Sequence, residues 1–160
     1  PTGIYYMLGA AHVRLLNRDK AIECFQKAVA TEPPREAAYV NLLQLLWDKN
    51  ATDEAYEILK LYALRFPAKE YEYYFYTTAT HQRAKKYDDA ISSANQAIKI
   101  NPASADARFA LGAAYLYQGN KPEADAQFEA AINLSPQLKN QIEEFKLNWK
   151  NNRTGSGGEG

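Results

Sequence analysis

The side chains in this sequence that could bind a metal or take part in catalysis include two histidines, one cysteine and the neighbouring carboxylates Asp88 and Asp89. Such groups do chemistry when they occur at fixed spacings that bring them together. Here His12 and His81 are far apart, and Cys24 is a lone cysteine. HExxH, CxxC and glycine-rich phosphate-loop patterns are absent from the sequence. We therefore expect no metal, no cofactor and no enzymatic activity, and we interpret the three side chains as interior packing residues.

The charged residues also fail to form a reactive group. Asp88 and Asp89 stand at a predicted helix start, where the helix dipole favours negative charge. Arg83, Lys85 and Lys86 are the densest basic group, too small to indicate nucleic-acid binding. Basic and acidic residues balance at 19 each, and no apolar run approaches the roughly 18 residues that cross a bilayer. We expect a protein or peptide partner, no nucleic acid and no membrane insertion.

Four evenly spaced prolines indicate where the helices that carry these residues begin and end. The gaps between them are 34, 35 and 34 residues, and the prolines are Pro33, Pro67, Pro102 and Pro136. Because proline interrupts a helix, regular prolines predict regular helix boundaries. A fixed period of this length is typical of a stacked helical repeat.

Other residues recur in register with the prolines. The last unit has Leu111, Gly112, Tyr115, Ala124, Phe128 and Ala131; the first has Leu8, Gly9, His12, Ala21, Phe25 and Ala28. The Ala, Phe and Ala positions follow one another at four and three residues, which places them on one helix face. Each unit therefore reads as two helices joined by a turn, with small residues where the helices approach closely.

This pattern resembles the tetratricopeptide repeat, W-x2-L-G-x2-Y, A-x3-F and P over 34 residues. In the last unit Arg108 replaces Trp, and in the first Tyr5 and His12 replace Trp and Tyr. The resemblance implies an all-α, right-handed α-solenoid of four helix pairs plus a C-terminal capping helix. It predicts a single domain over residues 1–152 and a flexible tail over 153–160. The predicted units are about 2–35, 36–70, 71–104 and 105–136, followed by the capping helix at 137–152.

The middle units depart from the family pattern. In the second, Leu43, Leu59 and Tyr62 replace Gly, Phe and Ala; in the third, Thr78 and Ala94 replace Gly and Phe. We hypothesise that large side chains in one unit compensate for small ones in the next, since cores tolerate exchanges that conserve total volume.

The predicted C-terminal helix has one apolar stripe, formed by Leu138, Ile142, Phe145 and Trp149. A helix that is polar on its other face suits the end of a solenoid. An alternative is that the stripe binds a partner. No comparable cap precedes the first unit, so we expect further repeats upstream.

In the family, the first helices of successive units line a concave groove, and the resemblance maps a set of partner-binding residues onto this sequence. They combine apolar anchors with polar groups that could hold a peptide backbone or an acidic group. The residues are Tyr6, Arg14, Val40, Asn41, Gln44, Trp47, Phe75, Tyr76, Arg83, Phe109 and Tyr117. The alternative is that several of these aromatic residues pack between units.

Some family members bind acidic C-termini through a clamp of Lys, Arg and Asn. Here Glu72 stands where the clamp requires a Lys, and only Asn41 matches, so we expect no clamp of this kind. The predicted function is a scaffold or adaptor that binds a peptide segment or helix in an apolar concave groove. The alternatives are self-association by end-to-end stacking and service as the interaction arm of a larger protein.

Overall fold

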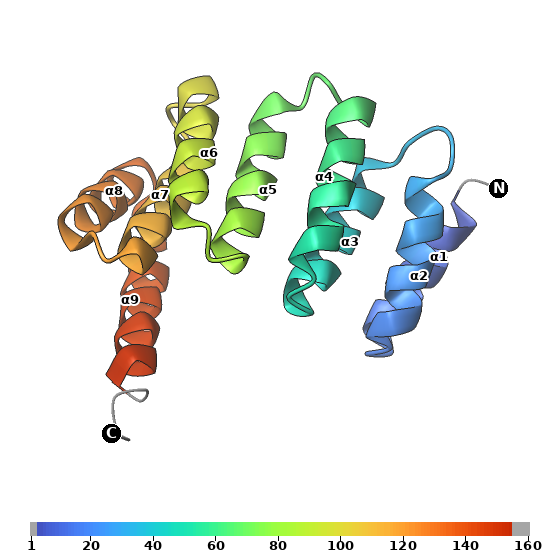
Figure 1. The fold of residues 1–160 in the computed structure, drawn as a ribbon, viewed down its shortest axis with the longest axis horizontal. Helices are drawn as coiled ribbons and strands as arrows, with labels where there is room; N and C mark the ends of the chain where they lie inside the picture. Colours follow the sequence, from blue (N-terminus) through green and yellow to red (C-terminus); the bar gives the residue numbers. More distant parts are fainter. Residues whose placement is uncertain (1–2, 155–160) are drawn as a thin grey trace. The chain divides into compact units, whose positions relative to one another are not determined.

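The computed structural model describes residues 3–154, without the side chain of Thr154, and these residues form helices joined by short loops, with no strand among them (Figure 1). The helices are α1 (Ile4–Arg14), α2 (Arg18–Val29), α3 (Glu36–Asp48), α4 (Thr52–Arg65), α5 (Glu70–Arg83), α6 (Tyr87–Ile100), α7 (Ala105–Gln118), α8 (Lys121–Leu134) and α9 (Lys139–Thr154), with a short 3-10 turn, η1 (Pro136–Leu138), before α9. The all-α helical-repeat fold predicted from the sequence is confirmed.

The chain divides into two compact units, Pro1–Lys86 and Tyr87–Gly160, which we call unit 1 and unit 2. Unit 1 contains α1 to α5, and unit 2 contains α6 to α9. The division falls between the two helices of the third predicted repeat. That all four pairs form one domain stays a prediction.

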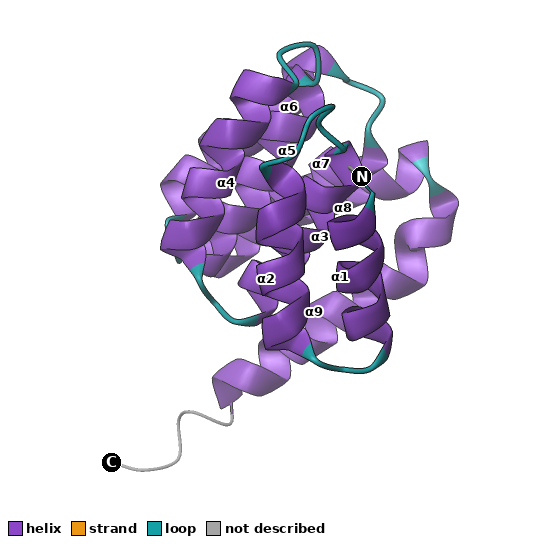
Figure 2. Cartoon of the chain, turned by 90° about the vertical axis from the view of Figure 1, so that its right-hand side faces the viewer, coloured by secondary structure: helices purple, strands orange, loops and turns teal. Residues whose placement is uncertain are grey.

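Close approach within the first and last helix pairs depends on glycine. Helices α1 and α2 run side by side (Figure 2). A Cβ atom on Gly9 would stand 2.7 Å from the Phe25 ring, and one on Gly112 would stand 2.8 Å from the Phe128 ring. Both distances are too short for non-bonded carbon atoms, so any larger residue would push the phenylalanine away. The predicted role of these small residues is confirmed.

Local side chains and backbone geometry end the helices. The Asn17 side chain accepts a hydrogen bond from the backbone N–H of Lys20, and Ser104 accepts one from Ala107. Such N-caps satisfy donors that have no partner within the helix. Gly119 ends α7 with φ of 96°, a left-handed conformation that glycine adopts readily. Pro122 lies in the first turn of α8, where its missing N–H removes no hydrogen bond of the helix.

The core of unit 1 is rich in tyrosine. Tyr39 and Tyr62 are fully buried, and their rings meet edge to face with centroids 6.0 Å apart. Tyr39 donates a hydrogen bond to the carbonyl of Val29, so its hydroxyl is satisfied inside the core. Tyr62 also contacts Tyr76 of α5, with ring centroids 5.6 Å apart. Tyr62, the large residue of the α3/α4 pair, therefore contacts the following helix, α5.

The core of unit 2 combines buried alanines with the C-terminal helix. Ala124, Phe128 and Ala131 of α8 are buried, and Ile142 of α9 is 1% exposed. Leu138, Phe145 and Trp149 pack against the same cluster. The predicted apolar stripe is thus confirmed as a packing face. Helix α9 continues two residues beyond the predicted end, and the rest of the predicted tail, residues 155–160, lies outside the described residues.

Candidate functional site

A groove of about 340 Å³ opens in unit 1 between α1, α3 and the loop that follows α1. Phe25 and Leu45 are buried beneath it, and Val13 forms part of its wall. The lining residues are Ala10, Val13, Arg14, Leu16, Arg18, Phe25, Asn41, Gln44, Leu45 and Asp48. Three predicted site residues, Arg14, Asn41 and Gln44, are therefore brought together over an apolar floor.

The polar rim of this groove offers hydrogen-bonding groups to a ligand. Gln44 donates a hydrogen bond to Asp48, with Nε2 and Oδ1 3.0 Å apart. Within residues 3–154, the half-buried Asn41 side chain makes no hydrogen bond and the exposed Arg14 forms no ion pair. An amide both donates and accepts, and a guanidinium pairs with carboxylates in two-pronged geometry.

Trp47, Tyr76 and Arg83 are engaged in a contact between α3 and α5. The indole Nε1 of Trp47 donates a hydrogen bond to Thr80 Oγ1 at 2.9 Å. The Arg83 guanidinium lies over the indole, 5.0 Å from the ring centroid, and Tyr76 packs beside it at 6.3 Å. For these three residues, the geometry matches the alternative in which aromatic residues pack between helices.

Tyr6, Val40 and Phe75 are half-buried in unit 1. The ring of Tyr6 lies against Phe25, with centroids 5.8 Å apart, and the Arg35 guanidinium covers it at 4.8 Å. Phe75 stacks on Tyr71 of its own helix, with centroids 6.1 Å apart. Large parts of both rings are therefore already in contact with protein.

Phe109 and Tyr117, the two remaining predicted site residues, belong to unit 2. Phe145 of α9 packs against both, with ring centroids 5.3 Å from Phe109 and 5.9 Å from Tyr117. Tyr117 remains 42% exposed, whereas Phe109 is half-buried. The C-terminal helix thus covers part of the surface that the sequence assigned to an open groove. A continuous row of anchors through all four repeats stays a prediction.

A charged network includes Glu72, the residue that the sequence analysis assigned to a clamp position. Tyr62 donates a hydrogen bond to Glu36 Oε1 at 2.7 Å. Lys69 Nζ lies 3.4 Å from carboxylate oxygens of both Glu36 and Glu72. Burial, followed by the hydrogen bond to Glu36 and the charge of that carboxylate, raises the pKa of Tyr62 well above its usual value. The hydrogen bond to Glu36 is also the main cause that raises the pKa of Lys69.

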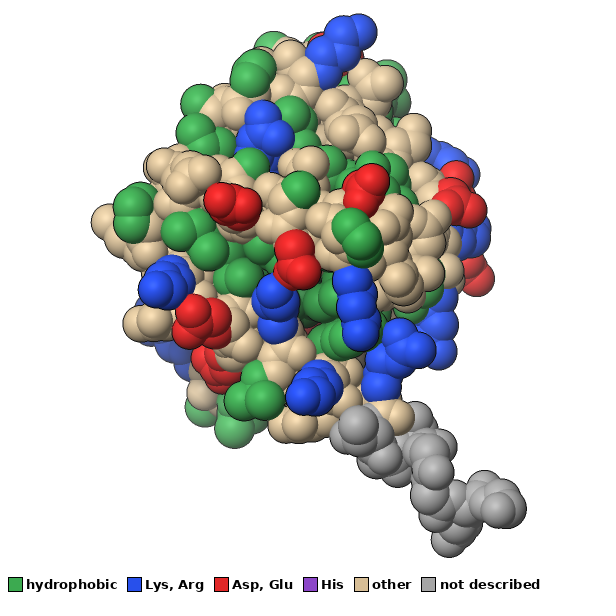
Figure 3. Space-filling view, turned by 90° about the vertical axis from the view of Figure 1, so that its left-hand side faces the viewer, with side chains coloured by type: hydrophobic (Ala, Val, Ile, Leu, Met, Phe, Trp, Pro, Cys, Tyr) green, Lys and Arg blue, Asp and Glu red, His purple; other side chains and the backbone are tan. Residues whose placement is uncertain are grey.

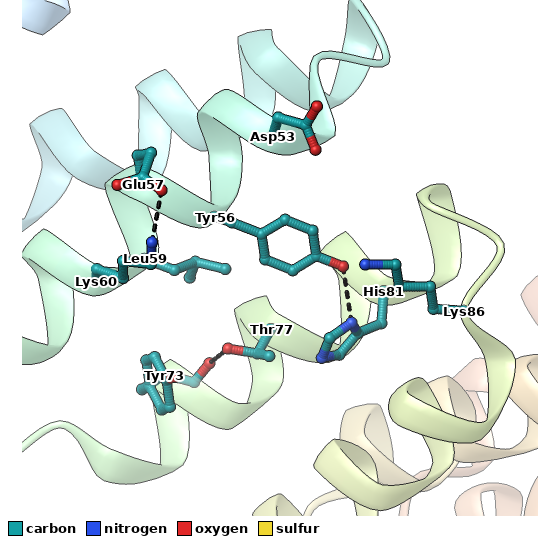
Figure 4. Close-up of a pocket in the computed structure, with 9 residues that line it drawn as sticks. All are labelled: Asp53, Tyr56, Glu57, Leu59, Lys60, Tyr73, Thr77, His81 and Lys86. Atoms are coloured by element: carbon teal, nitrogen blue, oxygen red, sulfur yellow. Dashed lines mark hydrogen bonds and ion pairs between the residues drawn. The ribbon is translucent and has the colours of Figure 1, made fainter.

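The sequence did not predict a second cavity, of about 540 Å³, between α4 and α5 (Figure 4). Several of its polar side chains contact one another. Tyr56 Oη and His81 Nδ1 are 2.7 Å apart, and Lys60 pairs with Glu57 at 2.6 Å. Lys86 lies over the Tyr56 ring, 5.2 Å from its centroid. These mutual contacts are those of a structural interface.

The other candidate groups show no sign of forming a metal site. His12 is half-buried, and its Nδ1 has no hydrogen-bond partner among the described residues. Within residues 3–154, no three His, Cys, Asp or Glu side chains gather as metal ligands. In the same part of the chain, no helix combines the length and apolar character needed to span a bilayer.

Sequence reasoning missed the contribution of the loop after α1. Leu16 of this loop and Arg18, the first residue of α2, line the groove, although only the first helices of the repeats were expected there. Leu16 is 84% exposed and has φ of 56°, a left-handed conformation uncommon for leucine. No sequence signal marks that conformation, because turn patterns place Gly or Asn at such positions.

Comparison with known families supports the repeat assignment. The family model described as "Tetratricopeptide repeat" matches residues 3–34 and 105–138, and one described as "TPR repeat" matches residues 83–119. These segments contain the first and last of the four predicted repeats and the end of the third repeat. A curated relative, the heat shock protein STI1 of Saccharomyces cerevisiae, is 28% identical over 131 residues. The match spans 81% of this chain and only 16% of that protein.

Solved structures share the fold at low sequence identity. TTC0263, a thermophilic TPR protein of Thermus thermophilus, is 20% identical with a TM-score of 0.73, covering 92% of this chain and 82% of that one. MamA of Desulfovibrio magneticus RS-1 is 16% identical with a TM-score of 0.71, covering 87% and 78%. Family models, relative and fold agree with the spacing of Gly, Phe and Pro in the sequence. The chain belongs to the tetratricopeptide repeat family, a family of non-catalytic protein-interaction modules.

Proposed function

We propose that the groove between α1 and α3 binds an extended peptide segment of a partner protein, and that the chain thereby acts as a scaffold or adaptor. The observation that carries this proposal is that Arg14 and Asn41 line the same groove and have no polar partners within residues 3–154. The floor of the groove contains Phe25 and Leu45. An apolar hollow with a few converging polar groups is the usual form of a ligand site.

We assign each part of the groove a contact with the bound peptide. The Asn41 amide would hold the peptide backbone, since it both donates and accepts hydrogen bonds. Arg14 would pair with a carboxylate of the peptide. The apolar surface around Val13 would receive an uncharged side chain, whose burial contributes roughly 1.5–3 kcal/mol.

The test is a selection of displayed peptides on the full chain, followed by titration of the best peptide with wild type and variants. We expect Asn41→Ala and Arg14→Ala each to weaken binding by about tenfold, since a lost polar contact to a charged or buried group costs roughly 1.5–3 kcal/mol. Gln26→Ala, an exposed change on α2, is the matched control and should leave affinity unchanged. Selected peptides that bind both groove variants as tightly as wild type would refute the proposal.

A second titration tests the expected absence of a carboxylate clamp. A peptide ending in Glu-Glu-Val-Asp should not bind at the α3–α5 surface, because Glu72 places a negative charge where the clamp needs a cation. Saturable binding of this peptide that is lost in Lys69→Ala and kept in Lys121→Glu and Arg14→Ala would contradict this expectation, because it would show that Lys69 supplies the cation.

A further inference from the structure

A further hollow, of about 410 Å³, lies in unit 2 between α8 and α9, and Leu116 of α7 also lines it. Leu116, Leu147 and Trp149 contribute to its mostly apolar wall. On the face drawn in Figure 3, acidic and basic side chains are interspersed with hydrophobic surface, and several Lys and Arg side chains gather on the lower part of that face. We call this hollow the α8–α9 groove.

Leu147 is a large apolar residue on the side of α9 that the fold does not use. The stripe that packs α9 against the core consists of Leu138, Ile142, Phe145 and Trp149, and Leu147 lies outside it. Its side chain is 58% exposed. A single exposed leucine is ordinary. This one lines a hollow with Trp149, so a ligand could bury both residues at once.

The rim of the α8–α9 groove is basic. Lys121, Lys146 and Lys150 line it, and Asp125 is the acidic side chain among its lining residues. Lys146 pairs with Asp125. Lys121 instead lies over the face of Trp149, 5.6 Å from the ring centroid, and has no carboxylate partner within residues 3–154. Three ammonium groups and one carboxylate leave a net positive charge around an apolar hollow.

This charge indicates the chemistry of the occupant. We propose that the α8–α9 groove binds a partner-protein segment in which a large apolar side chain is flanked by carboxylates. The apolar side chain would lie between Leu147 and Trp149, and a neighbouring carboxylate would pair with Lys121. The lysine would keep its contact with the indole, because a cation over an aromatic face retains donors for an anion.

A protein segment fits this surface better than an anionic membrane. A membrane-binding helix presents its apolar residues on a projecting face. Here Trp149 is half-buried, with Lys121 over its ring and the Arg153 guanidinium 4.9 Å from its centroid.

The test uses labelled hexapeptides and fluorescence anisotropy with the full chain. The probe is Glu-Asp-Leu-Phe-Glu-Asp, and its matched controls are Gln-Asn-Leu-Phe-Gln-Asn and Glu-Asp-Gly-Ser-Glu-Asp. We expect the probe to bind with Kd of about 10–100 μM and each control to bind at least ~10-fold more weakly. Raising the salt from about 0.05 to 0.5 M should weaken the probe several-fold, since exposed charges are screened.

Variants locate the binding. Lys121→Glu and Leu147→Ser should each weaken the probe by about tenfold, because each removes one of the two proposed contacts. Leu64→Ser and Lys20→Glu, at exposed positions of α4 and α2, are the matched controls and should leave affinity within about twofold. A circular dichroism spectrum checks that each variant is folded.

Four results would overturn the inference. The first is no saturation of the probe at about 1 mM. The second is undiminished binding by folded Lys121→Glu and Leu147→Ser. The third is sedimentation of the chain with phosphatidylserine vesicles that Leu147→Ser abolishes, which would make this face a membrane contact. Loss of probe binding in Arg14→Ala alone would place the peptide in the unit 1 groove and would equally overturn the inference.

Discussion

The α7/α8 pair and the α3/α4 pair occupy equivalent places in the repeat but fill them with different residues. In α7/α8, Gly112 allows the Phe128 ring to lie against the backbone of α7. In α3/α4, the same two positions hold Leu43 and Leu59, 0% and 2% exposed. One large and one minimal side chain are replaced by two of intermediate size. The fold therefore requires a filled interface rather than a particular pair of residues.

The last position of the Ala, Phe and Ala pattern also differs between the two pairs, and this difference affects the packing of the next helix. Ala131 of α8 leaves room beside Phe128, and Phe145 of α9 packs against that ring at 6.1 Å. Tyr62 of α4 occupies the equivalent place and extends to Tyr76 of α5. Where the position holds the small Ala131, the next helix contributes the aromatic ring of Phe145. Where it holds Tyr62, this residue contributes the aromatic ring itself.

The largest effect is expected for Tyr62→Ala. The fully buried ring contacts Tyr39, Phe66 and Tyr76, so its removal leaves a cavity and should lower the free energy of unfolding by about 3–5 kcal/mol. Urea denaturation followed by Trp47 fluorescence in a Trp149→Phe background would measure it in unit 1. A neutral result would disprove the idea that side-chain volumes compensate between successive helices.

The next effect tests the glycine of the contrasting pair. Gly112→Ala should destabilise the protein by about 1–3 kcal/mol, because the new methyl group overlaps the Phe128 ring. Adding Phe128→Leu to the same chain should recover part of that loss, giving an interaction energy of about 1 kcal/mol in a double-mutant cycle.

Gly3→Ala is the control for this cycle, since nothing lies within 4 Å of a Cβ atom placed there. It should change stability by less than about 0.5 kcal/mol. Additive behaviour of Gly112→Ala and Phe128→Leu would show that the two positions do not share one packing requirement.

The tyrosines of unit 1 predict a dependence on alkaline pH. Burial raises the pKa of Tyr39, Tyr62 and Tyr76 above the usual value, which is near 10. Above about pH 10, tyrosines of the unfolded chain lose protons that the folded chain retains, so the free energy of unfolding falls as pH rises. Their contribution is complete below that pH.

Tyr62→Phe sharpens this prediction. It removes the hydrogen bond to Glu36 and should cost about 1–2 kcal/mol at neutral pH. It should also make the decline above about pH 10 shallower, because one titrating group is lost. Urea denaturation at several pH values measures both effects, and an unchanged slope would show that Tyr62 does not contribute to the decline.

The smallest effects are expected from ion pairs on the surface of the two regions. Lys49 pairs with Asp19 at 3.0 Å, and Lys146 pairs with Asp125. Because all four side chains are substantially exposed, Lys49→Ala and Lys146→Ala should each change stability by less than about 1 kcal/mol. A loss above that in only one variant would mean that charge, as well as core volume, distinguishes the regions.

Part of the candidate site was predictable from the repeat register. Arg14, Asn41 and Gln44 were assigned to a groove, and the structure brings them to one. Asn41 and Gln44 share a face of α3 because residues three apart on a helix lie on one side, and partner binding by these residues stays a prediction. The same register could not show that Trp47 Nε1 binds Thr80, since that bond joins residues 33 positions apart.

The sequence by itself determined the helices, their pairing and the small residues between them, because these depend on local periodicity and on the steric effects of glycine and proline. Tertiary structure decided which predicted anchors are engaged. Phe145 of α9 covers Phe109, and Arg35 covers Tyr6. These contacts depend on how helices meet in three dimensions, and a helix face that is open in one repeat can be covered by any later segment of the chain.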